Sequence, residues 1–382
     1  MKVIAFYLPQ FHEIPENNEW WGEGFTEWVN VKKAIQFDKR QYQPRVPLNN
    51  NYYDLLNVEV MKWQAGLAKK YGVYGFCIYH YWFGGHKLLE KPVENLLEHT
   101  EIDIPYCLCW ANENWTNRWV SSPSSRKMLI EQTYGDEKEW KAHFDYFLPF
   151  FKDERYIKEN NKPLLVIYRP DLIERLEEML NFWDILACKN GFQGICYAYQ
   201  NADQAVFNYV NGKDRKFDYQ IEYQPTFSRR ILDRSFKKLA IKMKKRIFRG
   251  FDLLLHTHKF STMNYSLRLE VRNYDKDWEG ILAHVPDSAK CVPGAFVDWD
   301  NTPRRQMRGS FYVGANPEKF AYYFDKLVQR AKNVYKKDMI FIFAWNEWSE
   351  GGYLEPDEKN GHGYLEAIYQ VLKENNELPN KD

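Results

Sequence analysis

The sequence is poor in cysteine and has almost no net charge. It contains six cysteines in 382 residues, and Lys plus Arg number 53 against 52 for Asp plus Glu. The cysteine spacing matches neither a zinc site nor a disulfide scaffold, so we expect reduced cysteines packed in the core. Because positive and negative charges balance, the composition implies no general attraction to nucleic acid or to a membrane surface.

Long apolar runs are also missing. The residues after Met1, KVIAFYLP, form a run too short for the core of a signal peptide, and no later run approaches the ~18 apolar residues of a membrane span. We therefore expect a soluble, cytoplasmic protein. The sequence shows neither a glycine-rich phosphate fingerprint nor metal-ligand spacing, so it predicts no bound cofactor and no metal ion.

Aromatic residues, in contrast, are abundant, at 17% of the chain with 14 Trp. Their flat apolar faces and polar edges suit sugar rings as well as ordinary cores.

Short apolar runs alternate with longer helical patterns along the whole chain. The expected strands are residues 3–8, 73–79, 106–110, 164–168, 194–199, 217–223, 295–299 and 339–344. The expected helices are residues 58–71, 92–99, 137–151, 171–190, 317–336 and 363–375. Regular alternation indicates parallel βα units, and eight of them favour an α/β fold of the (β/α)8 TIM-barrel type, as one domain over residues 1–382. An open doubly wound sheet is the alternative.

The stretch MIFIFAWNEWSEGGY, residues 339–353, is the strongest candidate for an active site. A buried strand ends there in two carboxylates, Glu347 and Glu350, among aromatics, amides and glycines. Sugar chemistry needs two such groups, one as acid and the other as base or nucleophile. If the segment forms one helical turn, both carboxylates lie on the same face. The alternative is that Glu350 caps or salt-bridges a surface loop.

Functional side chains of a barrel enzyme follow the C-terminal ends of its strands. Carboxylates, amides, arginines and aromatics recur at these positions, which indicates a polar cleft with stacking walls suited to a glycan. Single members of the set, such as His80 or Trp110, are more often explained by packing in the core, and the recurrence at all strand ends carries the prediction. The candidates for substrate binding are His80, Tyr81, Trp82, Trp110, Asn112, Asn114, Trp115, Arg118, Tyr168, Arg169, Tyr223, Asp298, Asp300, Asn301, Trp345, Asn346, Trp348 and Tyr353.

A second catalytic pair competes with the first. Asn112-Glu113 and Asn346-Glu347 are two Asn-Glu dipeptides, after the third and the eighth expected strand. Around a closed ring these positions are three strands apart, as in the large class of barrel glycosidases with Asn-Glu sites. In that arrangement Glu113 is the acid and Glu347 the nucleophile. Asp298 and Asp300 come next as candidates.

A basic stretch interrupts the barrel pattern after the sixth strand. Residues 229–249 hold ten Lys and Arg against one Asp, with apolar residues interleaved, which predicts a basic amphipathic helix within an insertion over residues 229–260. It is either a solvated helix packed on the barrel or a peripheral contact with the inner membrane or a lipid-linked glycan. DNA binding is not expected, because no reading motif accompanies it.

Five segments of the chain carry a family resemblance. They are AFYLPQFHEIPENNEWWGEGFTEWVNV, GFCIYHYWF, CLCWANENWT, FVDWDNTPRR and AWNEWSEGGYLEPDE. From residue 3 to about residue 368 the chain resembles the WbsX-type proteins of bacterial polysaccharide loci, which are similar to glycoside hydrolase family 99. The resemblance implies a (β/α)8 barrel and carbohydrate chemistry. Family 99 enzymes are retaining endo-acting α-mannosidases, and by their motif Glu347 assists attack by the sugar's own 2-hydroxyl while Glu350 is the acid/base.

Three functions follow as hypotheses. The first is a glycosyltransferase of O-antigen or capsule assembly, acting on an oligosaccharide or polysaccharide that is free or lipid-linked. The second is a retaining endo-acting α-glycosidase or transglycosidase similar to α-mannosidases. The third is a catalytically idle barrel that only binds glycans.

Overall fold

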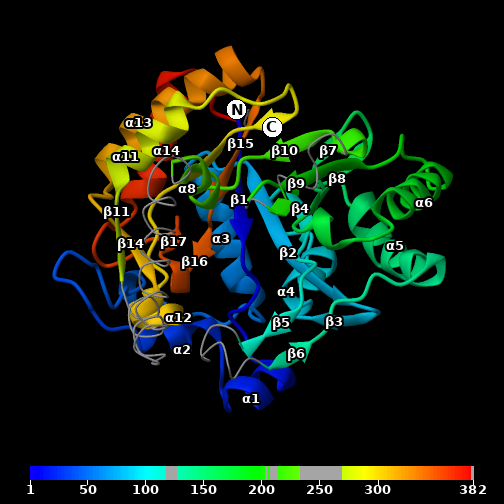
Figure 1. Ribbon diagram of the computed structural model, residues 1–382, viewed down its shortest axis with the longest axis horizontal. Helices are drawn as coiled ribbons and strands as arrows, with labels where there is room; N and C mark the ends of the chain where they lie inside the picture. Colours follow the sequence, from blue (N-terminus) through cyan, green and yellow to red (C-terminus); the bar gives the residue numbers. More distant parts are fainter. Residues whose placement is uncertain (118–126, 203–204, 207–213, 233–268, 380–382) are drawn as a thin grey trace, which may run out of the picture.

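Parallel strands form a nearly closed barrel at the centre of the molecule (Figure 1). The computed structural model describes residues 1–117, 127–202, 205–206, 214–232 and 269–379. The barrel strands are β1 (Lys2–Tyr7), β2 (Gly75–Phe83), β4 (Tyr106–Trp110), β8 (Lys162–Ile167), β9 (Cys196–Gln200), β10 (Tyr219–Ile221), β12 (Cys291–Val292), β13 (Gly294–Phe296) and β15 (Met339–Phe343).

The seventh strand of the barrel is divided into two short strands, β12 and β13. β12 pairs with β10 on one side, and β13, which follows after Pro293, pairs with β15 on the other. β15 pairs in turn with β1, with Val3 opposite Ile340. All eight expected strands are therefore present in sequential order, and the predicted α/β (β/α)8 barrel in a single domain is confirmed.

Helices cover the outside of the barrel (Figure 1). They are α3 (Val58–Lys70), α4 (Lys91–Glu98), α5 (Glu137–Lys152), α6 (Leu176–Lys189), α11 (Tyr274–Ala283), α13 (Pro317–Arg330) and α14 (Gly363–Glu374). The sequence pattern located six of these and missed α11, a short helix whose N-cap Asn273 accepts a hydrogen bond from Lys276 N at 2.8 Å. The helix expected over 171–190 is shorter, because a 3-10 turn, η4 (Pro170–Leu172), precedes it.

The core has two layers, one inside the barrel and one between barrel and helices. Inside, the Phe6 ring lies 5.8 Å from Tyr79, 5.2 Å from Tyr223 and 5.6 Å from Phe341. These side chains come from different strand positions around the ring, so they fill its interior. Five cysteines are buried as expected, but Cys188 is exposed on α6, because the outer face of that helix meets solvent.

Short elements gather at the C-terminal end of the barrel (Figure 1). They are α1 (Pro15–Trp21), α2 (Glu27–Lys32), η1 (Leu48–Asn50), α12 (Thr302–Arg305), η6 (Gln306–Arg308), β16 (Asn346–Glu347), η8 (Trp348–Glu350) and β17 (Gly352–Tyr353). α2, α12 and η8 contact one another there. Smaller strands complete the fold: β3 (His86–Leu88), β5 (Trp115–Thr116), β6 (Met128–Ile130), β7 (Lys158–Glu159), β11 (Glu270–Asn273) and β14 (Ser310–Val313).

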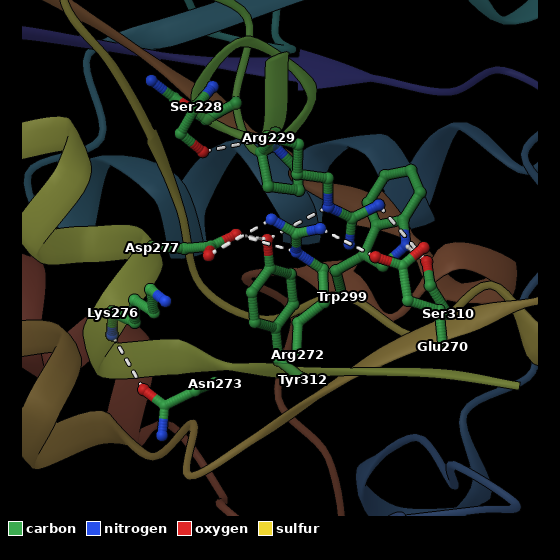
Figure 2. Close-up of polar contacts among 12 residues, drawn as sticks. Ser228, Arg229, Glu270, Arg272, Asn273, Lys276, Asp277, Trp299, Ser310 and Tyr312 are labelled. Carbon is green, nitrogen blue, oxygen red and sulfur yellow. Dashed lines mark hydrogen bonds and ion pairs between the residues drawn. The ribbon is translucent and has the colours of Figure 1, made fainter. Parts of the chain in front are cut away.

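The expected basic insertion over 229–260 lies mostly outside the described residues, apart from the end of α8 (Thr226–Leu232). Figure 2 shows how both flanks of that stretch are held. Arg229 donates to Tyr312 Oη at 3.1 Å and to Ser310 Oγ at 3.2 Å, while Arg272 on the far flank pairs with Asp277 at 3.0 Å. Tyr312 also donates to Asp277, so one polar network joins the two flanks. No described helix is long and apolar enough to cross a membrane.

Candidate active site

Three glutamates converge on one arginine at the C-terminal end of the barrel. Arg304 Nη2 lies 2.8 Å from Glu347 Oε1 and 3.1 Å from Glu27 Oε2, and Arg304 Nη1 lies 3.2 Å from Glu350 Oε1. All four side chains are largely buried. We call this group the Arg304 cluster. It brings together the two candidate catalytic residues of the 339–353 segment.

A tight turn after β15 places Glu347 and Glu350 side by side. β16 and β17 pair as a short antiparallel hairpin, and η8 forms the single turn between them. The turn ends at Gly351, whose φ of 66° is left-handed and whose added Cβ would lie 2.8 Å from Asp300 N. Asp300 N also donates to Glu350 O at 2.7 Å, so the segment after the seventh strand holds this turn. Only glycine fits this position without strain.

The protonation of Glu347 is set by its surroundings. Burial is the largest cause that raises the pKa of Glu347; the Arg304 guanidinium opposes it, the charges of Glu350 and Glu27 add to it, and the resulting pKa is about 8. With three carboxylates around one cation, the cluster has an excess of negative charge in a buried site. A carboxyl group that holds a proton near neutral pH is what acid/base chemistry requires.

Glu27 and Arg304 are not among the candidate residues predicted from the sequence. Glu27 begins α2, and its Oε2 accepts the Ser349 hydroxyl as well as Arg304. Ser349 stands between the two candidate glutamates, so Glu27 anchors their turn directly. The available signal was local: Glu27 lies in the polar, aromatic loop after the first strand, and Arg304 in NTPRR after the seventh.

Tyrosines from several strands face the Arg304 cluster. Tyr79 Oη lies 3.0 Å from Tyr223 Oη, and Tyr81 Oη accepts from Gln10 Nε2 at 3.0 Å. Burial raises the pKa of Tyr223, with further contributions from Tyr168 and from the charges of Glu350 and Glu347. Burial likewise raises the pKa of Tyr81, and the charge of Glu347 adds to it. The predicted residues Tyr81, Tyr168 and Tyr223 thus lie within electrostatic reach of the glutamates or of one another.

An aromatic rim continues from Tyr81. The half-buried Trp115 ring lies 5.0 Å from Tyr81, 5.9 Å from Phe83 and 5.8 Å from Trp20 of α1. Trp115 was a predicted binding residue, whereas Trp20 belongs to the loop after the first strand. The rim therefore offers stacking surface beside the carboxylates.

His80, Trp82 and Trp110 lie on the outer side of the barrel wall. His80 Nε2 is 2.9 Å from His143 Nε2 of α5, and Trp82 stacks on His143 at 4.4 Å. Trp110 meets the same histidine at 4.8 Å. Burial lowers the pKa of His80 to about 3, so this imidazole is neutral. The structure places these three predicted residues in the core between barrel and helix, away from the Arg304 cluster.

The asparagines of the two Asn-Glu dipeptides join neighbouring strand ends. Asn346 Oδ1 accepts Leu8 N at 2.7 Å, and its Nδ2 donates to Leu8 O at 3.0 Å. Asn112 does the same to Arg169, accepting from its N and donating to its O, both at 2.8 Å. Both asparagines are fully buried. Each amide therefore serves as a latch between adjacent strands.

Glu113 lies in a different setting from Glu347. Its side chain is 36% exposed and its Oε2 is 3.7 Å from Arg169 Nη1, while Arg169 Nη2 pairs with Asp171 at 2.7 Å. Asn114 is exposed and accepts Gln132 N at 2.6 Å. The structure does not bring Glu113 to Arg304, which holds Glu347 and Glu350. Arg118 lies outside the described residues.

The acidic residues after the seventh strand are engaged by the long loop after β1. Asp298 pairs with Arg45 at 2.7 Å, and Asp300 Oδ2 accepts Gln41 Nε2 at 3.1 Å. Asn301 Oδ1 accepts Ser310 N at 2.8 Å. These three predicted binding residues thus fasten the loop and β14 to the barrel. Among the described residues, no group of three or more His, Cys, Asp or Glu is arranged to hold a metal ion.

Glu355 organises the aromatic side chains next to the glutamates. It accepts the indole N–H groups of Trp345 at 3.0 Å and Trp348 at 2.6 Å, and Tyr53 Oη at 2.9 Å. Tyr353 stacks on Trp348 at 3.7 Å. Burial raises the pKa of Glu355 to about 7, while its hydrogen bonds oppose the increase. The predicted residues Trp345, Trp348 and Tyr353 are buried, and they pack next to the turn that carries Glu347 and Glu350.

Comparison with known proteins matches residues 3–368 to the family model described as Glycosyltransferase WbsX. The protein WxcX of Xanthomonas campestris pv. campestris, in strains B100 and ATCC 33913, is 34% identical over 97% of this chain and 49% of its own length. The chain thus spans about half the length of the curated relatives it matches.

Two solved structures support the fold. The GH99 endo-alpha-mannosidase from Bacteroides thetaiotaomicron in complex with bis-tris propane has a TM-score of 0.57 at 14% identity, covering 97% of this chain and 96% of that one. A glycoside hydrolase-like protein has a TM-score of 0.53 at 13% identity, covering 97% and 93% of the two chains. At this level of identity the likeness concerns the fold.

Proposed function

The chain belongs to the glycosyltransferase WbsX family, and from this premise we propose that it acts on glycosidic bonds of a bacterial surface polysaccharide, with Glu347 and Glu350 as its catalytic carboxylates. Family membership supports a carbohydrate-active enzyme of polysaccharide processing. The observation that carries the finer proposal is the Arg304 cluster: two buried carboxylates on one guanidinium, at the end of the barrel where such enzymes place their chemistry.

The cluster supplies the parts that glycosidic bond cleavage needs. One carboxyl must protonate the departing oxygen, and a second must activate the attacking group or stabilise positive charge on the sugar. The excess of negative charge around Arg304 favours an oxocarbenium-like transition state electrostatically. Tyr81 and Trp115 line the approach with aromatic surface and one phenol group.

The roles of the two glutamates make opposite demands on pH. With a pKa of about 8, Glu347 is largely protonated at neutral pH. If Glu347 is the base, as the family 99 motif suggests, kcat/KM rises as the pH increases through about 8. If it is the proton donor, kcat/KM falls over the same range. Whether kcat/KM rises or falls with pH near 8 therefore assigns the roles of the two glutamates.

Transfer and hydrolysis use the same first step. After cleavage, the glycosyl unit passes either to an acceptor sugar hydroxyl, which extends a glycan, or to water. We propose transfer between glycans as the principal reaction, acting on an oligosaccharide or polysaccharide, free or lipid-linked. This reaction needs no diphosphate site for a nucleotide donor.

The test compares wild type, Glu350→Gln and a matched control, Glu366→Gln, whose carboxylate is exposed on α14. Each is incubated with α-linked oligosaccharides and aryl glycosides, with and without nucleotide sugars, and products are measured by mass spectrometry. We expect products without a nucleotide sugar, reduced about 10²- to 10⁴-fold only in Glu350→Gln.

Two results would contradict the proposal. Product only in the presence of a nucleotide sugar would make the protein a donor-dependent transferase with a different site. Glycan affinity that Glu350→Gln leaves unchanged, with no turnover by wild type, would identify an idle binding barrel.

A further inference from the structure

A hollow lies at the rim of the barrel, and no residue of the Arg304 cluster lines it. It has a volume of about 540 Å³ and lies between η1, α3 and the segment after β17. Its principal lining residues are Asn49, Asn50, Asn51, Tyr52, Trp63 and His362. Apart from the His362 imidazole and the Tyr52 phenol, none of its lining residues carries an ionisable group, so the hollow offers mainly amides and aromatic rings.

The three neighbouring asparagines present side-chain amides that other protein groups do not occupy. Their backbone N–H groups are used: Asn49 N donates to Glu358 Oε1 at 2.6 Å, Asn50 N to Pro47 O at 2.9 Å, and Asn51 N to Leu48 O at 3.3 Å. Within the described part of the chain, their side-chain amides make no hydrogen bond. Each amide carries both donors and an acceptor, the pattern that pairs with the hydroxyls of a sugar.

The turn that carries these amides is held in place. Leu48 N donates to Pro356 O at 3.0 Å, which ties η1 to the segment after β17. Asn49 and Asn50 adopt left-handed backbone conformations, with φ of 58° and 55°, that asparagine tolerates better than most residues. A turn fixed in this way loses little conformational freedom when a ligand binds.

Trp63 supplies an aromatic surface beside the amides. Its indole on α3 is 37% exposed, and its ring contact is with Tyr53 at 6.4 Å. The Tyr52 ring is instead covered by Lys32 Nζ, 4.2 Å from its centroid. An exposed indole next to fixed amides suits the apolar face and the hydroxyl edge of a pyranose ring.

We propose that this hollow is a second carbohydrate-binding site, which holds a neutral segment of a glycan through stacking on Trp63 and hydrogen bonds to Asn49, Asn50 and Asn51. Binding there requires no turnover, so the proposal stands apart from catalysis by Glu347 and Glu350. The segment from Glu355 to His362 connects the hollow to the residues that hold the turn of Glu347 and Glu350, because Glu355 binds Trp348 and His362 lines the hollow. A glycan polymer bound in the hollow would thus stay on the enzyme between reactions.

The test is affinity electrophoresis of the full chain in gels that contain yeast α-mannan, dextran or amylopectin, with polygalacturonate as an anionic contrast. Trp63→Ala removes the stacking face, and Asn51→Ala removes one amide at a backbone position with ordinary φ. Tyr322→Ala is the matched control, because Tyr322 is an exposed aromatic, at 56%, on α13 and does not line the hollow. Thermal unfolding confirms that each variant is folded.

We expect at least one neutral polymer to retard wild type, Tyr322→Ala and Glu350→Gln alike. Trp63→Ala should weaken that binding roughly two- to tenfold, Asn51→Ala should weaken it less, and Trp63→Phe should restore most of it. Retardation that Trp63→Ala leaves unchanged would overturn the proposal, as would retardation by polygalacturonate alone. Absence of retardation by every neutral polymer would also overturn it. Failure to detect turnover would bear on the proposed catalysis instead.

Discussion

Asn112-Glu113 and Asn346-Glu347 follow two strands of the same barrel. Their asparagines have the same structural role, but their glutamates lie in different surroundings. Both asparagines bind the backbone N–H and C=O of a residue at the end of the next strand. The glutamates differ: Glu113 is 36% exposed beside Arg169, whereas Glu347 is 6% exposed on Arg304 with two other carboxylates nearby. The dipeptide therefore encodes a strand latch, and the surroundings of the glutamate decide whether it suits acid/base chemistry.

The largest difference between the two dipeptides should appear in activity. Glu347→Gln removes a carboxyl of the Arg304 cluster, so we expect kcat to fall about 10²- to 10⁴-fold. Glu113→Gln changes a partly exposed carboxylate outside the Arg304 cluster, and we expect less than about a tenfold change in kcat. Steady-state kinetics on the substrate found in the product screen measures both.

Equal losses in both variants would break this comparison. They would favour the arrangement in which Glu113 is the acid and Glu347 the nucleophile, three strands apart. Glu366→Gln serves as the control for a neutralised carboxylate remote from the cluster.

Stability should show what the dipeptides have in common. Asn346→Ala and Asn112→Ala each leave a buried backbone N–H and C=O without a partner, so we expect each to lower the free energy of unfolding by about 2–4 kcal/mol. Asn114→Ala, which loses one hydrogen bond at an exposed site, should cost less than about 1 kcal/mol. Urea unfolding measures all three. A cost confined to Asn346→Ala would show that the two latches are not equivalent.

The smallest effect concerns the part of the pH profile of kcat/KM that the pKa of Glu347 sets, which we call the Glu347 limb. Because the charge of Glu27 raises the pKa of Glu347, Glu27→Gln should lower that pKa and move the limb of kcat/KM to lower pH by up to about one unit. Ser349→Ala removes only the hydrogen bond to Glu27, and Glu113→Gln lies outside the cluster, so neither should move the limb. An unchanged limb in Glu27→Gln would show that Glu27 does not influence the proton on Glu347.

Carboxyl ¹³C NMR of glutamate-labelled protein offers the same test without a substrate. The signal of Glu347 is identified by its loss in Glu347→Gln. Its titration midpoint should fall in Glu27→Gln and stay in place in Ser349→Ala, for the same electrostatic reason.

The barrel was predictable because each of its strands is buried on both faces. Runs such as residues 339–343 are short, apolar and rich in β-branched or aromatic residues, and the helical patterns between them are long. α11 was missed because its ten residues mix charged and apolar side chains with little length to reveal a period. The insertion over 229–260 stays a prediction, as does membrane contact through residues 229–249.

The site was predictable only where it is local in sequence. Glu347 and Glu350 stand three residues apart, but Glu27 and Arg304 reach them through the fold, and no local pattern joins those positions. Strand alternation separates Tyr79 and Tyr81 from His80 and Trp82, yet both faces of a barrel strand are apolar and aromatic. The sequence therefore does not reveal which set points into the barrel. The sequence suggests that Trp345 and Trp348 stack on sugars, but in the structure both are buried and donate their indole N–H groups to Glu355.

The pairing of β1 with β15 has a consequence for biosynthesis. β1 is translated first among the barrel strands and β15 last, so one edge of β1 has no strand partner until the ribosome has made nearly the whole barrel. Val3 has no partner on this edge until Ile340 has been synthesised, and Leu8 N has no hydrogen-bond acceptor until Asn346 has been synthesised. An apolar strand exposed for that long is prone to pair with other nascent chains. We therefore expect the yield of native protein in cells to depend on chaperones more than its equilibrium stability would suggest.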